Sequence, residues 1–113
     1  MDDETLDAVG KITHTYLYVL HDGEVVHRNV AAKLVAEELG LIEDSSPKEL
    51  VERAQEKLLP LLDVLLETGF LLSRPQKSVM IAPKGLDALI DHEGTFSKAF
   101  IEKEIPSVLS LQF

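Results

Sequence analysis

The sequence predicts a mainly α-helical domain with a small β-hairpin, and three observations lead to this fold class. Apolar residues recur every three or four positions along most of the chain, which is the spacing of a helix that buries one face. One stretch, residues 71–82, instead holds two short β-favourable runs on either side of a turn that contains proline. No repeat, linker or low-complexity tract divides the 113 residues, so we expect a single domain over residues 1–113.

The first element is a helix expected over residues 3–21. Its apolar stripe begins with Leu6 and Val9, and the acidic residues 2–4 lie where the positive end of a helix dipole favours negative charge. A His-Asp-Gly turn signal ends it. The segment 24–27 that follows is long enough for only a short strand.

The second helix is expected over residues 29–39. Gly40 stands where a helix commonly ends in a left-handed residue. The apolar pair 41–42 should then pack the connection back onto the core.

The third helix has the clearest local signals, and we expect it over residues 47–68. Ser46 and Glu49 fit a capping box, in which each side chain accepts a hydrogen bond from the other residue's backbone N–H, with proline at the first helical position. The glycine and phenylalanine at residues 69–70 fit a Schellman ending. Pro60 lies inside the helix and should either kink or break it.

The rest of the chain predicts a hairpin, a helix and an apolar tail. Residues 71–74 and 78–82 should pair as antiparallel strands, and a helix should follow over residues 84–92. The tail, residues 95–113, has apolar residues at helical spacing.

This order of elements resembles the winged-helix fold. The segment 65–71 (LLETGFL) resembles the end of a recognition helix that runs into the first wing strand. The segment 80–86 (MIAPKGL) is similar to the second wing strand and the Pro-Lys-Gly corner of MarR- and PadR-like transcriptional regulators. The resemblance covers about residues 12–91, with extra helices at both ends. It implies a small DNA-binding regulator that dimerises through its terminal helices.

Composition excludes several classes of protein. The chain has 20 acidic against 11 basic residues, a formal charge of −9, which excludes a generally basic protein that coats nucleic acid. It has no cysteine, which excludes disulfides, thiolate metal sites and cysteine catalysis. No apolar run is long enough to span a membrane and the acidic N-terminus is unlike a signal peptide, so we expect a cytoplasmic protein without a membrane partner.

We find no signal for an enzyme, a metal or a cofactor. The four histidines contain no close-spaced pair of the kind that zinc sites use. The serines fit no nucleophile elbow, and the six glycines are scattered as stops and turns rather than gathered in a phosphate loop.

The charge pattern gives two candidate nucleic-acid surfaces. Cations on the third helix alternate with glutamates, which would repel phosphates, whereas residues 71–86 contain three cations and no acid. The alternative is that the hairpin has no binding role: its tip is solvated, and its lysines keep the sheet edge from pairing with another strand. The candidate contacts are Lys48, Arg53, Lys57, Arg74, Lys77 and Lys84.

The tail holds more apolar residues than the end of a chain normally needs. It either forms a homodimer together with the first helix or folds back to complete the chain's own core. Tyr16 and Tyr18 similarly fit either a small-ligand pocket or core and interface packing. The candidate dimer or partner contacts are Tyr16, Phe96, Phe100, Ile101, Ile105, Leu109 and Phe113.

Two functions therefore stay open. The first is a dimeric winged-helix transcriptional regulator that binds duplex DNA. The second is a winged-helix module that binds protein, with its acidic helices facing a basic partner in an assembly. Both functions use the same fold, so only the surface properties of the chain can distinguish them.

Overall fold

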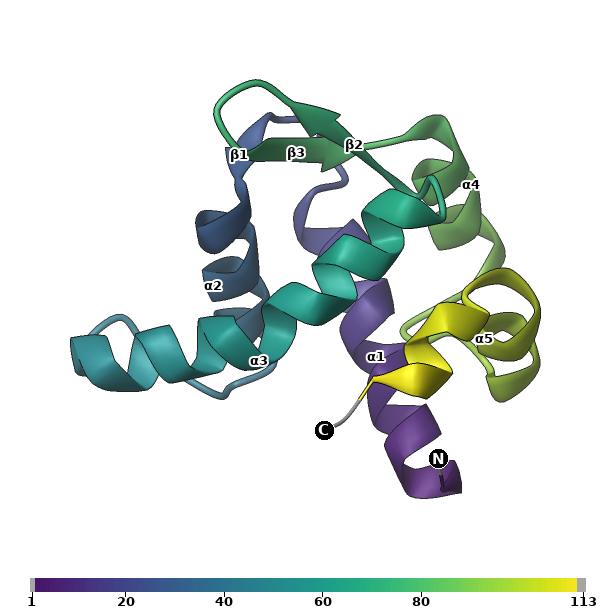
Figure 1. The fold of residues 1–113 in the computed structure, drawn as a ribbon, viewed down its shortest axis with the longest axis horizontal. Helices are drawn as coiled ribbons and strands as arrows, with labels where there is room; N and C mark the ends of the chain where they lie inside the picture. The colour runs from purple at the N-terminus through teal and green to yellow at the C-terminus, as the bar shows by residue number, and fades with distance from the viewer. Residues whose placement is uncertain (1, 112–113) are drawn as a thin grey trace.

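The computed structural model describes residues 2–111 and contains five α-helices and one three-stranded antiparallel sheet (Figure 1). This confirms the mainly α-helical class with a small hairpin and adds a third strand to it. In chain order the elements are α1 (Asp3–Val19), β1 (Val26–His27), α2 (Arg28–Glu38), α3 (Lys48–Glu67), β2 (Leu71–Arg74), β3 (Ser78–Ile81), α4 (Pro83–Asp91), α5 (Lys98–Glu104) and the 3-10 turn η1 (Pro106–Ser110).

The sheet is built around β3, with strand order β1-β3-β2. The hairpin pairs Leu71 with Ile81 at its base and Arg74 with Ser78 at its tip. The short strand expected before α2 is present as two residues, and its Val26 lies opposite Val79 of β3. The sheet therefore joins the start of α2 to the end of α3, which lie far apart in the sequence (Figure 1).

The two predicted glycine-terminated helix ends are confirmed. Gly40 (φ 75°) and Gly69 (φ 84°) are left-handed, and the next residue of each donates a backbone hydrogen bond five residues back, the pattern of a Schellman motif. Phe70 is buried after its glycine, as expected. Leu41 is not, since it is 54% exposed, and only Ile42 packs the α2–α3 connection onto the core.

The predicted capping box at the start of α3 is wrong. The Ser46 hydroxyl accepts from the backbone N–H of Glu43 at 2.8 Å, within the preceding turn, so it does not cap Glu49. The helix begins at Lys48, after Pro47, without a side-chain cap. A serine hydroxyl can accept a hydrogen bond within a local turn as readily as at a helix end, and the Ser46 hydroxyl does so within the turn.

Pro60 does not divide α3. The helix runs without a break from Lys48 to Glu67, and its ribbon changes direction along its length (Figure 1). Proline removes one backbone hydrogen bond, and its ring crowds the preceding turn, which bends a helix that is held on both sides of it.

The core forms where α1 meets α2, α3, α4 and α5. Its largest fully buried side chains include Tyr16 and Leu17 of α1, Leu20 directly after that helix, and Leu61, Leu62 and Leu65 of α3. The tail belongs to the same core, because Phe96, Ile101, Ile105 and Val108 are all buried in it. Among residues 2–111, no helix is long and apolar enough to cross a membrane.

Two glycines are close-packing positions rather than stops or turns. A Cβ on Gly10 of α1 would lie 2.3 Å from the carbonyl oxygen of Phe96, and one on Gly85 of α4 would lie 2.5 Å from that of Phe70. Both helices can approach a neighbouring backbone only because these side chains are absent. Gly10 thus sets how closely the tail lies on α1.

Candidate functional site

The hairpin presents two of the predicted cations at its tip. Arg74 ends β2 and Lys77 lies in the turn, and both side chains are exposed. Gln76 and Lys77 adopt the left-handed conformation, with φ of 62° and 59°, which is costly for residues other than glycine. The Lys77 carbonyl accepts from the backbone N–H of Arg28 at 2.9 Å, so the tip is tied to the start of α2.

Lys84, the third cation of this stretch, lies beyond the base of the hairpin. Its Nζ donates to the carbonyl oxygen of Thr68 at 2.8 Å and sits 4.4 Å from the centre of the Phe70 ring. Lys84 therefore closes the C-terminal end of α3, where a cation also suits the helix dipole. The structure brings Arg74 and Lys77 together and leaves Lys84 apart from them.

The three predicted cations of α3 fall into two groups. Lys48 extends into solvent, with a side chain that is 88% exposed and 3.8 Å from the Glu52 carboxylate. Arg53 and Lys57 instead line a hollow of about 200 Å³. The other residues that line it are Leu41, Leu50 and Ala54. We call these five residues the α3 hollow.

The hairpin tip and the α3 hollow lie at opposite ends of α2. Lys77 contacts the first residue of α2, whereas Leu41 follows its last turn. A helix of 11 residues is roughly 16 Å long at 1.5 Å per residue. The two groups of cations are therefore separate surfaces.

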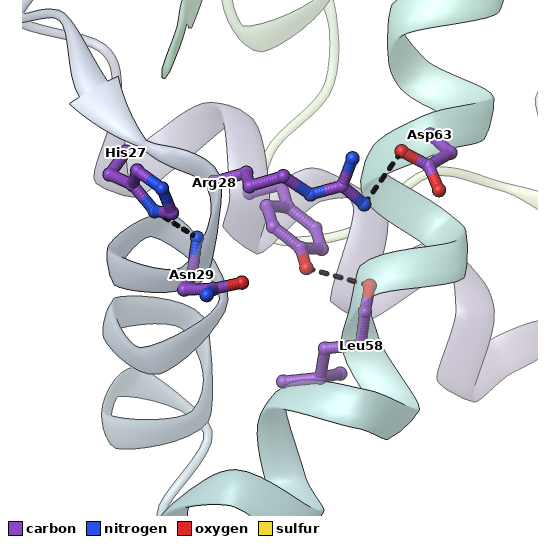
Figure 2. A network of polar contacts seen from close by, with 6 residues as sticks. His27, Arg28, Asn29, Leu58 and Asp63 are labelled. Atoms are coloured by element: carbon purple, nitrogen blue, oxygen red, sulfur yellow. Dashed lines mark hydrogen bonds and ion pairs between the residues drawn. The ribbon is translucent and has the colours of Figure 1, made fainter. Parts of the chain in front are cut away.

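A network of polar contacts fixes α1, α2 and α3 relative to one another (Figure 2). The buried Tyr16 hydroxyl donates to the Leu58 carbonyl oxygen at 2.7 Å, and burial raises the pKa of this phenol far above its ordinary value. Arg28 forms an ion pair with Asp63 at 2.9 Å. The His27 ring caps the start of α2 by accepting from the backbone N–H of Asn29. Tyr16 thus has a structural role and is closed off from a ligand pocket or a partner surface.

Arg28 is a residue next to the hairpin that the sequence analysis did not single out. Its backbone holds the turn through Lys77, while its side chain turns toward α3 and pairs with Asp63 (Figure 2). The only signal for it in the sequence was a cation directly after the short strand. The short strand pairs with β3, which is distant in the sequence. This cation could therefore not be placed near the hairpin until the order of the strands was known.

A larger hollow of about 450 Å³ lies between α1 and α4. Two of its histidines are held by backbone carbonyls: Nε2 of His14 donates to His92 at 2.9 Å, and Nδ1 of His21 donates to Tyr18 at 2.6 Å. The wall from α4 is apolar and carries Ile90, whose side chain is 79% exposed. The residues that line this hollow are His14, Tyr18, His21, Leu86, Leu89, Ile90, His92, Glu93 and Gly94.

The structure places most of the predicted dimer contacts inside this chain. Tyr16, Phe96, Ile101 and Ile105 are fully buried in the core, so they offer no surface to a second copy, which corrects their assignment. These four residues fit the alternative, in which the tail folds back and completes the chain's own core. Of the others, Phe100 is half-buried and Leu109 is 41% exposed, and Phe113 lies outside the described residues. Dimerisation itself stays a prediction.

Among residues 2–111, no three histidine, aspartate or glutamate side chains gather as metal ligands would. Comparison with known proteins gives no match to a family model, to a curated protein or to a solved structure. A function for this chain therefore has to be inferred from its own surfaces.

Proposed function

We propose that this chain is a winged-helix protein that contacts duplex DNA through its hairpin and acts as a dimeric transcriptional regulator. The element order α1-β1-α2-α3-β2-β3 supports the fold, because it is the order on which the resemblance was based. In this proposal the chain binds DNA in the cytoplasm and has no catalytic role.

The observation that carries the proposal is the hairpin itself. Arg74 and Lys77 project from a stretch, residues 71–86, that contains no carboxylate in a chain of formal charge −9. Phosphate contacts by exposed cations are the main source of affinity in non-specific DNA binding. The turn is also held in place by its hydrogen bond to α2, so binding should cost it little conformational entropy.

Helix α3 contributes less in this proposal than a recognition helix usually does. Its exposed face carries Glu49, Glu52 and Glu56 between the cations, and a major groove lined by phosphates disfavours each of them. Lys48 is paired with Glu52, and Arg53 and Lys57 face an apolar hollow. We therefore expect weak, sequence-tolerant binding led by the hairpin.

The test is a salt titration of binding to a labelled random-sequence duplex, followed by fluorescence anisotropy, with light scattering on the same sample for the oligomeric state. Arg74→Glu and Lys77→Glu should each weaken binding and lower the slope of log affinity against log salt by about 1. Lys48→Glu, a matched charge reversal in α3, should change the slope less. If all three variants behave like the wild type, or if no binding occurs at low salt, the DNA proposal is refuted.

A second candidate, a module that binds protein, is supported by the apolar hollow between α1 and α4. Leu86 and Ile90 stand one helical turn apart and are both exposed beside it, which is the pattern of an anchor for a partner. In this case the acidic helices would face a basic partner. The chain would then show no DNA binding at low salt, and Ile90→Ser would abolish co-purification of the partner without altering stability.

A further inference from the structure

The α3 hollow combines exposed apolar surface with cations that have no ion-pair partner. Leu41 and Leu50 are 54% and 42% exposed at this hollow, although the sequence led us to expect that Leu41 packs on the core. Within residues 2–111, the ion pairs are Arg28–Asp63, Lys48–Glu52 and Lys98–Asp3, so neither Arg53 nor Lys57 takes part in one.

Two helix features shape the hollow. Leu41 follows the left-handed Gly40, whose Schellman motif fixes where the side chain of Leu41 starts. Leu50, Arg53 and Lys57 come from α3 at spacings of three and four residues, so they share one face of that helix. This first part of α3 extends past the end of α2 (Figure 1). The surface is therefore accessible.

The size and charge of the hollow define what fits it. Its volume of about 200 Å³ is smaller than the roughly 300–1,000 Å³ of pockets that hold drug-sized ligands, and it suits one apolar side chain. The two cations at its edge call for carboxylates next to that side chain. A nucleic acid would supply the negative charge, but it would leave the two exposed leucines uncovered.

We propose that the α3 hollow docks a short acidic segment of a partner protein, with one apolar anchor residue between Leu41 and Leu50 and carboxylates on Arg53 and Lys57. This goes beyond the proposed DNA binding and does not depend on it, because the hairpin tip lies at the other end of α2. If both surfaces are used, the chain joins a protein partner to DNA.

The probe is a fluorescein-labelled octapeptide of glutamates with one central leucine, and the protein is the full chain labelled with ¹⁵N. We expect binding with amide shift changes confined to the five residues of the hollow and their neighbours. Leu50→Ser and Arg53→Glu should each weaken binding by about tenfold or more, as expected when an anchor or a partly desolvated charge is removed. A peptide with serine in place of the leucine should bind equally weakly.

Two matched variants serve as controls. Leu109→Ser removes an apolar side chain of similar exposure (41%) elsewhere, and Lys48→Glu reverses a charge on α3 outside the hollow. Neither should change peptide affinity by more than about twofold, the scale of an exposed charge or methyl group. Circular dichroism on every variant confirms that the fold is retained, and all the substituted side chains are exposed.

Three results would overturn the proposal. The first is no binding of the peptide at millimolar concentration. The second is binding that is indifferent to Leu50→Ser and to the leucine of the peptide, since this leaves only non-specific charge attraction. The third is a titration with duplex DNA that shifts the amides of the hollow and is weakened by Arg53→Glu, which would assign this surface to DNA instead.

Discussion

Replacing Gly10 by alanine should destabilise the protein, although intrinsic helix propensity predicts the opposite. In an unobstructed helix the change gains about 1 kcal/mol. Here the new Cβ would lie 2.3 Å from the carbonyl oxygen of Phe96, and real Cβ contacts are essentially never shorter than 3.0 Å, so the tail must move away from α1. That movement also strains the hydrogen bond from the Phe96 N–H to the Gly10 carbonyl, 3.2 Å long in the native chain.

The magnitude follows from these terms. Overpacking of this kind costs about 1–3 kcal/mol, and a weakened backbone hydrogen bond adds about 1 kcal/mol. After the helix-propensity gain is subtracted, we expect a net loss of about 2 kcal/mol in the free energy of unfolding. For a domain of this length such a loss lowers the melting temperature by roughly 8 °C.

The assay is urea unfolding followed by far-UV circular dichroism, with the midpoint and the slope both fitted. Ala8→Gly, at an exposed position of the same helix, provides the control for propensity and should cost about 1 kcal/mol. If Gly10→Ala is as stable as the wild type or more so, then the tail does not lie against α1 as described. Rapid cleavage of the tail in Gly10→Ala by a protease would independently confirm that it has detached.

Three further predictions concern single side chains. Gln76→Gly should raise the free energy of unfolding by about 1 kcal/mol in thermal melts, because a left-handed residue with a Cβ is strained, and an unchanged melting temperature would contradict the turn geometry. Tyr16→Phe should cost about 1 kcal/mol in urea unfolding, since its hydroxyl has a buried acceptor, whereas Tyr18→Phe should cost nothing measurable. The pKa of Glu37 is raised above its ordinary value of 4.5, first by a hydrogen bond with Asp44 and then by burial and by the negative charge of Asp44. The folded chain therefore holds this proton more tightly than the unfolded chain, so stability contributed by the protonated pair is lost as pH rises above the ordinary pKa and through the raised one. Asp44→Asn should remove that loss, and urea midpoints of the two proteins compared across this pH range will show whether it does.

Local signals in the sequence predicted most of the elements. The endings at Gly40 and Gly69 were predictable because a Schellman motif is set by residues within one turn of each other. The start of α3 was not, because two local hydrogen-bonding patterns compete for the Ser46 hydroxyl and the sequence permits both. Gly10 and Gly85 were misjudged because their importance depends on backbone from a distant segment, which no local pattern encodes.

The candidate sites were less predictable than the elements. The acid-free hairpin was visible in the sequence because Arg74 and Lys77 lie close together in the chain. The α3 hollow was not, because Leu41 reaches it from the far side of a loop and meets Arg53 and Lys57 only in the folded chain. For the same reason the tail residue Phe96 was assigned to an interface, since helical spacing shows which face is apolar but does not show what covers it.

The uncapped start and the internal proline of α3 have a consequence for its dynamics. The first buried side chain of this helix is Leu58, and the turns before it are held by the partly buried Val51 and Ala54 and by the hydrogen bond that Gln55 Nε2 donates to the Asn29 carbonyl oxygen. Pro60 removes a hydrogen bond that would couple these turns to the rest of the helix. One continuous helix should therefore behave as two cooperative units, with amide protons exchanging much faster in residues 48–57 than in residues 61–67. The half that opens first bears Leu50, Arg53 and Lys57. A partner bound to this face should therefore slow amide hydrogen exchange in that half, even though the partner covers only part of the helix.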